Sequence, residues 1–189
     1  YYISVTEKNS LSVRELRERI KNKEYQRIDD NTKLKLINKE EISIGDTIKN
    51  PIIIKNKLDI DKEDISEKIL QKLILEDIPS FLKELGEGYS FIENEYKIKI
   101  NNTYNYIDLL LFNIKYNCYV VVELKVTEVK KEHIGQVEVY MNYIDKHVKG
   151  INNNKTIGII VARRDNHYYI EYSSDKRIYT RDYEICLLY

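Results

Sequence analysis

The chain has 189 residues, of which 42% are hydrophobic and 33% are charged, and its 31 Lys and Arg residues balance its 31 Asp and Glu residues. This length can bury one sizeable core, and the composition excludes disordered and membrane-embedded classes of protein. A net charge of zero gives no basic excess to mark a nucleic-acid partner, although charge that gathers locally in a groove can still serve one.

The two cysteines, Cys118 and Cys186, lie in apolar, strand-like runs and lack the spacing of a metal site. Such cysteines are typical of free thiols in a reducing compartment, which predicts the cytoplasm. No apolar run is long enough to cross a membrane, and the first residues, YYISVTEKNS, lack the regions of a signal peptide. We therefore expect no membrane partner. The chain begins with Tyr1 rather than Met, as a fragment would.

A capping-box pattern marks the first helix. Ser12 is followed by Glu15, and apolar residues recur behind them at helical spacing, which predicts a helix over about residues 13–26. The opposite face of this helix is highly charged. Its apolar stripe consists of Val13, Leu16 and Ile20, and burial of this stripe against a second copy of the chain favours a homodimer.

A change of pattern predicts a domain boundary. Residues 27–57 mix Asp, Asn, Lys and Ile without a sustained period and contain Pro51, which indicates a short helix over about 32–38 followed by a linker. We therefore expect residues 1–55 to form a short helical segment with its linker, and residues 56–189 to form the main domain.

The main domain shows alternating helical and strand patterns. From Asp61 a helical period runs to Gly86, and Pro79 is expected to kink or split this helix. Four strand-like runs follow at 89–92, 96–100, 106–112 and 119–126. A helix over about 130–149, a buried strand over 156–162 and two further strands at 168–172 and 179–188 complete the chain.

This order of elements predicts the fold class. A strand followed by a crossover helix and another strand usually gives a parallel pair, whereas strands in a meander are antiparallel. The predicted fold is therefore α/β, with a mixed central sheet flanked by helices on both faces.

Two carboxylates lie in the middle of the apolar stretch YNYIDLLLFNIKYNCYVVVELKV. A hairpin with a tight turn at Lys115 and Tyr116 would place Asp108 opposite Glu123, with Lys125 on the same face as Glu123. Two opposed carboxylates in apolar surroundings repel each other and are costly to desolvate, so one must be protonated or a cation must lie between them. Mg²⁺ suits this position because it prefers oxygen ligands.

The alternative is an ordinary surface pair on a solvated face of the sheet, with Lys125 bridging the two acids. Solvated faces are polar at every second residue, whereas the neighbours on this face are Leu110, Phe112, Tyr119 and Val121. These apolar neighbours favour the interpretation that the two acids lie at the edge of a buried surface.

The arrangement of elements and acids resembles the PDDEXK nuclease superfamily, with its restriction-endonuclease-like αβββαβ core. More narrowly, FLKELGEGYSF, YIDLLLFN, YVVVELKV, HIGQVEVYMNYID and KTIGIIVARRDN resemble successive segments of the YhcG-like family of nucleases. LSVRELRERI resembles the end of that family's N-terminal helical domain. The spacing of Asp, Glu and Lys alone is a weak signal, but five segments in order are specific.

The resemblance implies a role for each matching residue. Asp108 and Glu123 match the acids that bind the metal, together with the backbone carbonyl of Leu124. Lys125 matches the lysine that orients or deprotonates the attacking water. Glu84 matches an acid on the first core helix that can complete the metal site, and a further helix residue, Gln136, matches one that supports the site.

Some of these positions have a simpler interpretation. The superfamily's name implies Pro before the first acid, and this chain has Ile107 there. Glu84 also fits a helix-end acid that faces solvent. Gln136 also fits a polar residue beside a stripe formed by Tyr140 and Tyr143.

Basic residues near the predicted site are candidates for nucleic-acid binding. Lys130, Lys131, Arg163 and Arg164 could track phosphates along a rim, but each also fits an ordinary solvated surface.

The function that the resemblance implies is metal-dependent hydrolysis of phosphodiester bonds, with Mg²⁺ or Mn²⁺ as the cofactor. DNA is the expected substrate, and RNA is kept as the alternative. Two other functions stay open: a catalytically silent module that binds nucleic acid or docks a partner on the same fold, and a toxin or defence component whose target is selected by another protein.

Overall fold

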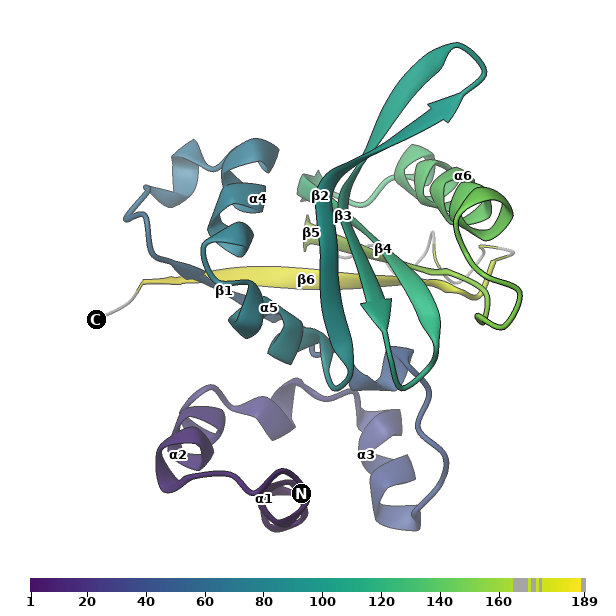
Figure 1. The fold of residues 1–189 in the computed structure, drawn as a ribbon. Helices are drawn as coiled ribbons and strands as arrows, with labels where there is room; N and C mark the ends of the chain where they lie inside the picture. Colours follow the sequence, from purple (N-terminus) through teal and green to yellow (C-terminus); the bar gives the residue numbers. More distant parts are fainter. Residues whose placement is uncertain (165–169, 171–172, 174, 188–189) are drawn as a thin grey trace. The chain divides into compact units, whose positions relative to one another are not determined.

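The computed structural model describes residues 1–164, 170, 173 and 175–187. The chain divides into two units, Tyr1–Asn50 and Pro51–Tyr189 (Figure 1). Within the described ranges, no helix combines the length and the apolar character that a membrane crossing requires.

The N-terminal unit consists of the helices α1 (Tyr2–Asn9), α2 (Val13–Lys21) and α3 (Asp30–Asn38), with short 3₁₀ turns at Glu24–Arg27 and Gly45–Thr47. The predicted capping box is confirmed. The Glu15 N–H donates to Ser12 Oγ at 3.3 Å, and the Ser12 N–H donates to Glu15 Oε2 at 2.9 Å. α2 ends earlier than predicted because Lys23 adopts a left-handed conformation, with φ of 50°, and a 3₁₀ turn follows. The sequence pattern did not predict α1.

The apolar stripe of α2 is exposed at Val13 and Ile20 and only partly buried at Leu16 within the described part of the chain. Val13 is 66% exposed and Ile20 is 50% exposed, and α2 contains no buried residue. The homodimer through this stripe therefore stays a prediction.

The two units divide at Pro51, inside the stretch 27–57 that the sequence marks as the boundary region and a few residues before the predicted division after residue 55. Ile52–Asn56 forms the strand β1, which pairs in parallel with β6 (Ile178–Leu187) at the far end of the chain. A run of three isoleucines suits a buried strand. The sequence pattern places these isoleucines in a linker, because the pairing of β1 with β6 cannot be inferred from a single short apolar run.

The second unit is built on a six-stranded sheet in the order β1-β6-β5-β4-β3-β2. Its other strands are β2 (Tyr89–Ile100), β3 (Thr103–Asn113), β4 (Cys118–Glu128) and β5 (Ile157–Arg164). The pairs from β2 to β4 are antiparallel and those from β4 to β1 are parallel, so the predicted mixed sheet is confirmed. The strand predicted at 168–172 falls outside the described residues, apart from Ile170.

Helices cover both faces of this sheet, as predicted. The helical pattern after Asp61 is split into a 3₁₀ turn (Lys62–Asp64), α4 (Glu67–Leu75) and α5 (Ile78–Leu85), with Pro79 in the first turn of α5. The crossover helix α6 (Lys131–His147) connects the parallel strands β4 and β5. Figure 1 shows α4 and α5 on one side of the central strands and α6 on the other.

A close contact between α6 and the sheet explains one glycine. A Cβ atom added at Gly158 in β5 would clash with the Val137 side chain and would lie 3.0 Å from the Met141 sulfur. Leu110, Val121 and Ile160 join Val137 and Met141 in the same buried cluster. The missing side chain at position 158 lets α6 lie close to the sheet and fixes its depth.

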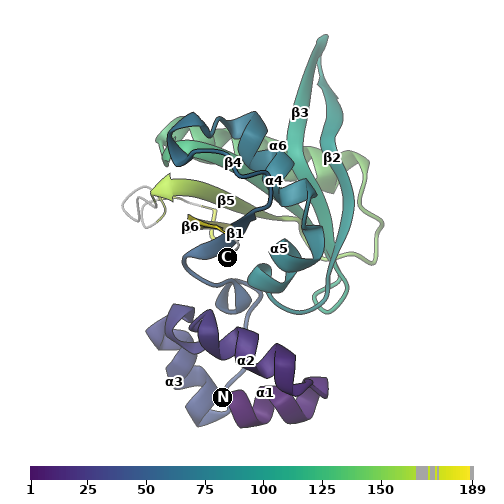
Figure 2. The same cartoon turned by 90° about the vertical axis from the view of Figure 1, so that its left-hand side faces the viewer.

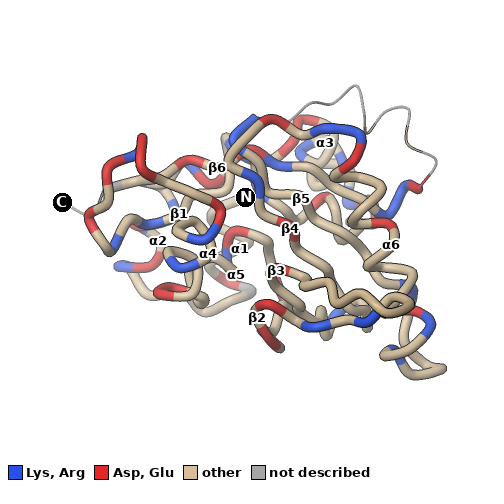
Figure 3. Tube along the Cα trace, turned by 90° about the horizontal axis from the view of Figure 1, so that it is seen from above, with Lys and Arg blue, Asp and Glu red and all other residues tan. Residues whose placement is uncertain are grey.

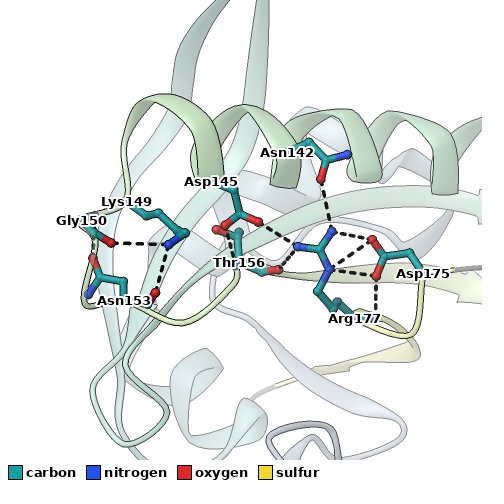
Figure 4. Close-up of polar contacts among 8 residues, drawn as sticks. All are labelled: Asn142, Asp145, Lys149, Gly150, Asn153, Thr156, Asp175 and Arg177. Atoms are coloured by element: carbon teal, nitrogen blue, oxygen red, sulfur yellow. Dashed lines mark hydrogen bonds and ion pairs between the residues drawn. The ribbon is translucent and has the colours of Figure 1, made fainter.

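A polar cluster around Arg177 joins the C-terminal half of α6 to the beginnings of β5 and β6 (Figure 4). Its guanidinium donates to Asp145 Oδ2 at 2.9 Å, to Asp175 Oδ2 at 2.6 Å and to the Thr156 carbonyl at 3.2 Å. Asp145 Oδ1 in turn accepts the Thr156 N–H at 2.8 Å. These bonds fix α6 over the sheet.

The strands β2 and β3 form a hairpin that extends beyond the rest of the sheet (Figures 1 and 2). β2 merges the two strands predicted at 89–92 and 96–100. Two irregularities explain the interrupted pattern: the register shifts between Phe91 and Glu93, and Glu95 has a left-handed φ of 49°.

Candidate active site

The β3–β4 hairpin brings the two predicted acids together. Its register pairs Leu109 with Val122 and Asn113 with Cys118, around a turn that contains Lys115. This is the predicted register. The backbone pairing of β3 with β4 ends at Leu109. At the next position, the Asp108 side chain instead accepts a hydrogen bond from the backbone of β4.

Asp108 is held from two directions. The Leu124 N–H of β4 donates to Asp108 Oδ2 at 2.8 Å, and Gln71 Nε2 of α4 donates to the Asp108 carbonyl at 3.0 Å. A carboxylate that accepts a backbone N–H has a fixed orientation.

Glu123 and Lys125 lie two residues apart on β4 and share the face covered by α6. Their partners in β5, Ile160 and Ala162, belong to the buried cluster around that helix. Lys125 Nζ lies 2.9 Å from Glu123 Oε1. Glu123 is only 2% exposed, so the interpretation of the acids as an ordinary solvated pair is wrong for this residue.

One oxygen of Glu123 is buried without a hydrogen-bond partner. Glu123 Oε2 is one of three such side-chain atoms within the described residues. A buried polar atom without a partner costs free energy, and it is unusual enough in folded proteins to call for an explanation. A cation bound beside Asp108 would supply the missing partner.

The pKa values reflect this crowding. Burial, followed by the charge of Asp108, raises the pKa of Glu123 to about 7. Burial also raises the pKa of Asp108, although the hydrogen bond from Leu124 and the charge of Lys125 oppose it. Burial lowers the pKa of Lys125, but the carboxylates of Glu123 and Glu67 outweigh this effect and the pKa is raised overall. Lys125 therefore remains a cation at neutral pH.

Glu67 is a site residue that sequence reasoning missed. It is the first residue of α4, and its Oε2 lies 3.5 Å from Lys125 Nζ. Its charge raises the pKa of both Asp108 and Glu123. Lys125 thus bridges Glu123 and Glu67 rather than the two predicted acids. The available signal was an acid at the start of the first core helix, where the helix comes nearest to β4.

Glu84 has a different place from the one expected. It lies at the end of α5, is 9% exposed, and its Oε2 accepts the Ile53 N–H of β1 at 3.0 Å. Its carboxylate therefore joins α5 to the edge of the sheet. Glu84 therefore does not face solvent, and its described hydrogen bond goes to β1 rather than to Asp108 or Glu123.

Glu95 is a second acid that the sequence did not single out. The register pairs Asn94 with Leu109 and Tyr96 with Ile107, which places Glu95 opposite Asp108. The charge of Glu95 raises the pKa of Asp108. A left-handed, non-glycine residue inside a strand is uncommon, and such conformations concentrate at functional sites.

The helix α6 brings polar side chains to the acids. Gln136 Nε2 donates to the Tyr140 hydroxyl at 2.9 Å. Burial raises the pKa of Tyr140, and the charges of Glu123 and Asp108 raise this pKa further. The hydrogen bond with Gln136 lowers it, but the pKa is raised overall. Burial and the charge of Lys125 lower the pKa of His133. Gln136 thus bonds to a tyrosine whose pKa the charges of the acids raise, and its supporting role at the site stays a prediction.

The four predicted basic residues lie at or just after the C-terminal ends of β4 and β5. Lys130, Lys131, Arg163 and Arg164 are all exposed. The Val129 N–H donates to the Arg164 carbonyl at 3.2 Å, so the chain on either side of this bond lies close together. Arg163 and Arg164 end β5, and Lys130 and Lys131 lie just after β4, at the start of α6.

The donor set fits a hard divalent cation with few protein ligands. Across the described residues, no three side chains of His, Cys, Asp or Glu come together as a preformed metal site. Asp108 and Glu123 supply two carboxylates on adjacent strands, and the Leu124 carbonyl between Glu123 and Lys125 is a third oxygen donor. Mg²⁺ commonly binds through one or two carboxylates and keeps several waters, so this small set is sufficient.

Comparison with known proteins gives a consistent result. The family described as the YhcG PDDEXK nuclease domain matches residues 45–188. The YhcG protein of Escherichia coli (strain K12), whose name describes it as a candidate nuclease, is 27% identical over 101 residues, which cover 53% of this chain and 27% of that protein. The chain therefore spans about a quarter of the length of this relative.

Two solved structures are similar at low identity. A repair endonuclease from Pyrococcus abyssi has a TM-score of 0.44 and 19% identity, over 65% of this chain and 49% of that one. A complex of EndoMS with double-stranded DNA has a TM-score of 0.46 and 19% identity, over 65% of this chain and 48% of that one.

Proposed function

Because the chain belongs to the YhcG PDDEXK nuclease domain family, we propose that it hydrolyses phosphodiester bonds at Asp108, Glu123 and Lys125 with the help of Mg²⁺ or Mn²⁺. The observation that carries the proposal is the buried, unpartnered Oε2 of Glu123 beside a second carboxylate. A structural ion pair gives no reason to bury a carboxylate oxygen without a partner, whereas at a cation site that oxygen would bind the cation.

Asp108, Glu123 and the Leu124 carbonyl would hold the cation. Bound there, a divalent cation would supply polarisation of the phosphate and a lowered pKa for a water molecule. Lys125 stays protonated, so its role is to orient the attacking water and to balance the negative charge that develops on the phosphate. The hydrogen bond from Leu124 fixes the Asp108 carboxylate for this task.

Other residues act through these three. Glu67 would position Lys125 by its ion pair, and it takes the place on the first core helix that was expected for Glu84. Gln136 would orient the Tyr140 hydroxyl against the acids. Both are proposed as positioning residues, because they contact protein groups of the site.

DNA is the proposed substrate, and RNA is the alternative. The family resemblance and the exposed basic residues where β4 and β5 end support a nucleic acid, because phosphate contacts by Lys and Arg supply most non-specific affinity. Cys118 and Cys186 are free thiols, which supports the cytoplasm as the location.

The test is incubation of the purified chain with labelled duplex, branched and single-stranded DNA and with RNA, with and without Mn²⁺. We expect cleavage of at least one DNA form only when the metal is present. The Glu123→Gln variant should cut none of them. Metal binding measured by calorimetry without any cleavage would contradict the nuclease and favour the catalytically silent module.

The exposed stripe on α2 supports a homodimer as the assembly. Removal of residues 1–50 would remove that stripe but leave the family's core elements in place. We expect light scattering to give a dimer mass for the whole chain and a monomer mass for the shortened chain. An unchanged monomer mass in both would overturn this part of the proposal.

A further inference from the structure

The two faces of the β2–β3 hairpin differ beyond the point where it leaves the sheet. Ile98 is 1% exposed and belongs to the cluster around α6, and its neighbours Tyr96 and Ile100 pack against the same cluster. The Lys99 N–H also donates to the Tyr143 hydroxyl of α6 at 3.4 Å. Since side chains alternate along a strand, Lys97 and Lys99 point away from α6.

The strand β3 completes this outer face with two tyrosines. The register places Tyr106 opposite Lys97 and Tyr104 opposite Lys99. Both tyrosines are 52% exposed. Lys97 Nζ lies 3.8 Å from the centre of the Tyr104 ring and Lys99 Nζ lies 5.7 Å from it. We name these four residues, Lys97, Lys99, Tyr104 and Tyr106, the hairpin platform.

The charge of the hairpin changes along its length. Glu93 and Glu95 lie on β2 near the body of the sheet, and Lys97 and Lys99 follow toward the tip (Figure 3). Between Glu95 and Asp108 the chain contains no acidic residue. The platform is therefore locally basic in a chain whose net charge is zero.

The platform shares the strand β3 with Asp108 of the proposed catalytic site. Tyr106 lies two residues before Asp108 on β3, and Tyr104 lies four residues before it. At a strand rise of about 3.3 Å per residue, the two tyrosines lie roughly 7 Å and 13 Å from Asp108 along the strand. These lengths match the reach of the nucleotides that flank a phosphate at the catalytic site.

We propose that the hairpin platform binds unpaired nucleotides next to the phosphate that is cut, with bases stacked on Tyr104 and Tyr106 and phosphates contacted by Lys97 and Lys99. The inference rests on the proposed nuclease function. Exposed aromatic rings beside cations are the means by which proteins hold single strands. A duplex hides the faces of its bases, so the rings select a single-stranded flank.

A structural role for the same residues has a distinct signature. Cross-strand pairs of Lys and Tyr also stabilise a two-stranded ribbon, and lysines protect an edge strand from pairing with another sheet. In that case the platform would affect the melting temperature but not the choice between single-stranded and duplex nucleic acid.

The test measures binding by fluorescence anisotropy in EDTA, so that metal-dependent cleavage is absent. The probes are a labelled single-stranded oligodeoxynucleotide and a blunt duplex of the same sequence. The Tyr104→Thr and Tyr106→Thr double variant should weaken binding to the single strand at least tenfold, because stacking contributes about fivefold to 100-fold per base. Binding to the duplex should change less than threefold. The matched Tyr104→Phe and Tyr106→Phe variant keeps both rings and should bind as the unmodified chain does.

A second variant tests the lysines. Lys97→Gln with Lys99→Gln should reduce the slope of log Kd against log salt concentration for the single strand by about 1.4, since each phosphate contact contributes about 0.7. The platform would be overturned if the variants lost affinity for the single strand and the duplex equally. It would also be overturned if the Thr double variant kept both its affinity for the single strand and its melting temperature. If cleavage depends on Glu123 but the platform variants bind normally, the nuclease function is supported and the platform is contradicted. Ring-dependent binding without any cleavage would support the platform and contradict the nuclease.

Discussion

Two regions beneath α6 hold charged side chains at the edge of the core, and they satisfy those charges very differently. Near the C-terminal end of the helix, Arg177 donates to two carboxylates and to a backbone carbonyl (Figure 4). The hydrogen bond from Arg177 keeps the pKa of Asp175 below its usual value, so the folded state favours the charged form. Near the beginning of the helix, Glu123 is buried, keeps one oxygen without a partner, and has a pKa raised to about 7.

The contrast separates a structural cluster from the one that we propose as the active site. The Arg177 cluster stabilises the fold, because each charge has a partner of opposite sign and correct geometry. We expect the pair Asp108 and Glu123 to destabilise the protein without a cation, because two acids interact in a region of low solvent access. Active sites commonly sacrifice stability in this way for the geometry that their chemistry needs.

The largest expected effect lies in the functional cluster. Glu123→Gln and Lys125→Ala should each lower the rate of metal-dependent cleavage by about 100-fold or more, because each removes a charge positioned for the transition state. Lys115→Ala, in the turn of the same hairpin, is the matched control and should cut normally. A gel assay of cleavage products measures this, and cleavage that survives both site variants would place the active site elsewhere.

The structural cluster should show the opposite behaviour. Arg177→Met should lower the free energy of unfolding by roughly 2–3 kcal/mol, because it leaves the carboxylates of Asp145 and Asp175 without their cation. Chemical denaturation measures the change, with Lys146→Met on the exposed side of α6 as the control. Retained stability in the Arg177 variant would show that the cluster contributes little to the fold.

The same comparison applies to two glutamates, one in each kind of environment. Glu84→Leu should cost about 1–3 kcal/mol of unfolding free energy, because the partly buried Ile53 N–H loses its acceptor. Glu67→Leu should leave stability nearly unchanged but lower cleavage about tenfold through the position of Lys125. Parallel denaturation and cleavage assays decide this, and the reverse pattern would restore Glu84 as the site residue.

A smaller effect is expected from pH. The pKa of Glu123 is about 7 in the folded chain and 4.5 for an unperturbed side chain, so the folded state binds more protons than the unfolded state between these values. Stability from this group is therefore greatest at low pH and is lost as the pH rises from about 4.5 to 7. In EDTA, the melting temperature of the unmodified chain minus that of Glu123→Gln should fall between pH 5 and pH 8. A difference that stays constant would mean that Glu123 is charged throughout.

Local patterns predicted much of the fold and the centre of the site. The turn near Lys115 and the period of two along each strand together define which residues face each other, so Asp108 and Glu123 could be paired from the sequence. The strong apolar period of α6 gave its limits to within two residues. β1 was missed because its identity as a strand depends on β6, far along the chain.

The supporting residues of the site were harder to predict for a similar reason. The sequence shows that Glu67 and Glu84 both belong to the first helical region, but not which end of that region approaches β4. Pro79 splits this region into two helices, so Glu84 meets β1 and Glu67 meets Lys125. The left-handed conformation of Glu95, and hence its position opposite Asp108, gave no sequence signal because glycine is the usual residue there.

The melting temperature of Asp108→Asn, with and without metal, tests most directly whether the acids are held together at a cost that a cation relieves. The substitution keeps the shape of the side chain, keeps an acceptor for the Leu124 N–H and removes one of two repelling charges. In EDTA at neutral pH the variant should melt at a higher temperature than the unmodified chain, and Mg²⁺ or Mn²⁺ should stabilise the unmodified chain but hardly affect the variant. A variant that melts lower in EDTA and keeps its full response to metal would contradict this account.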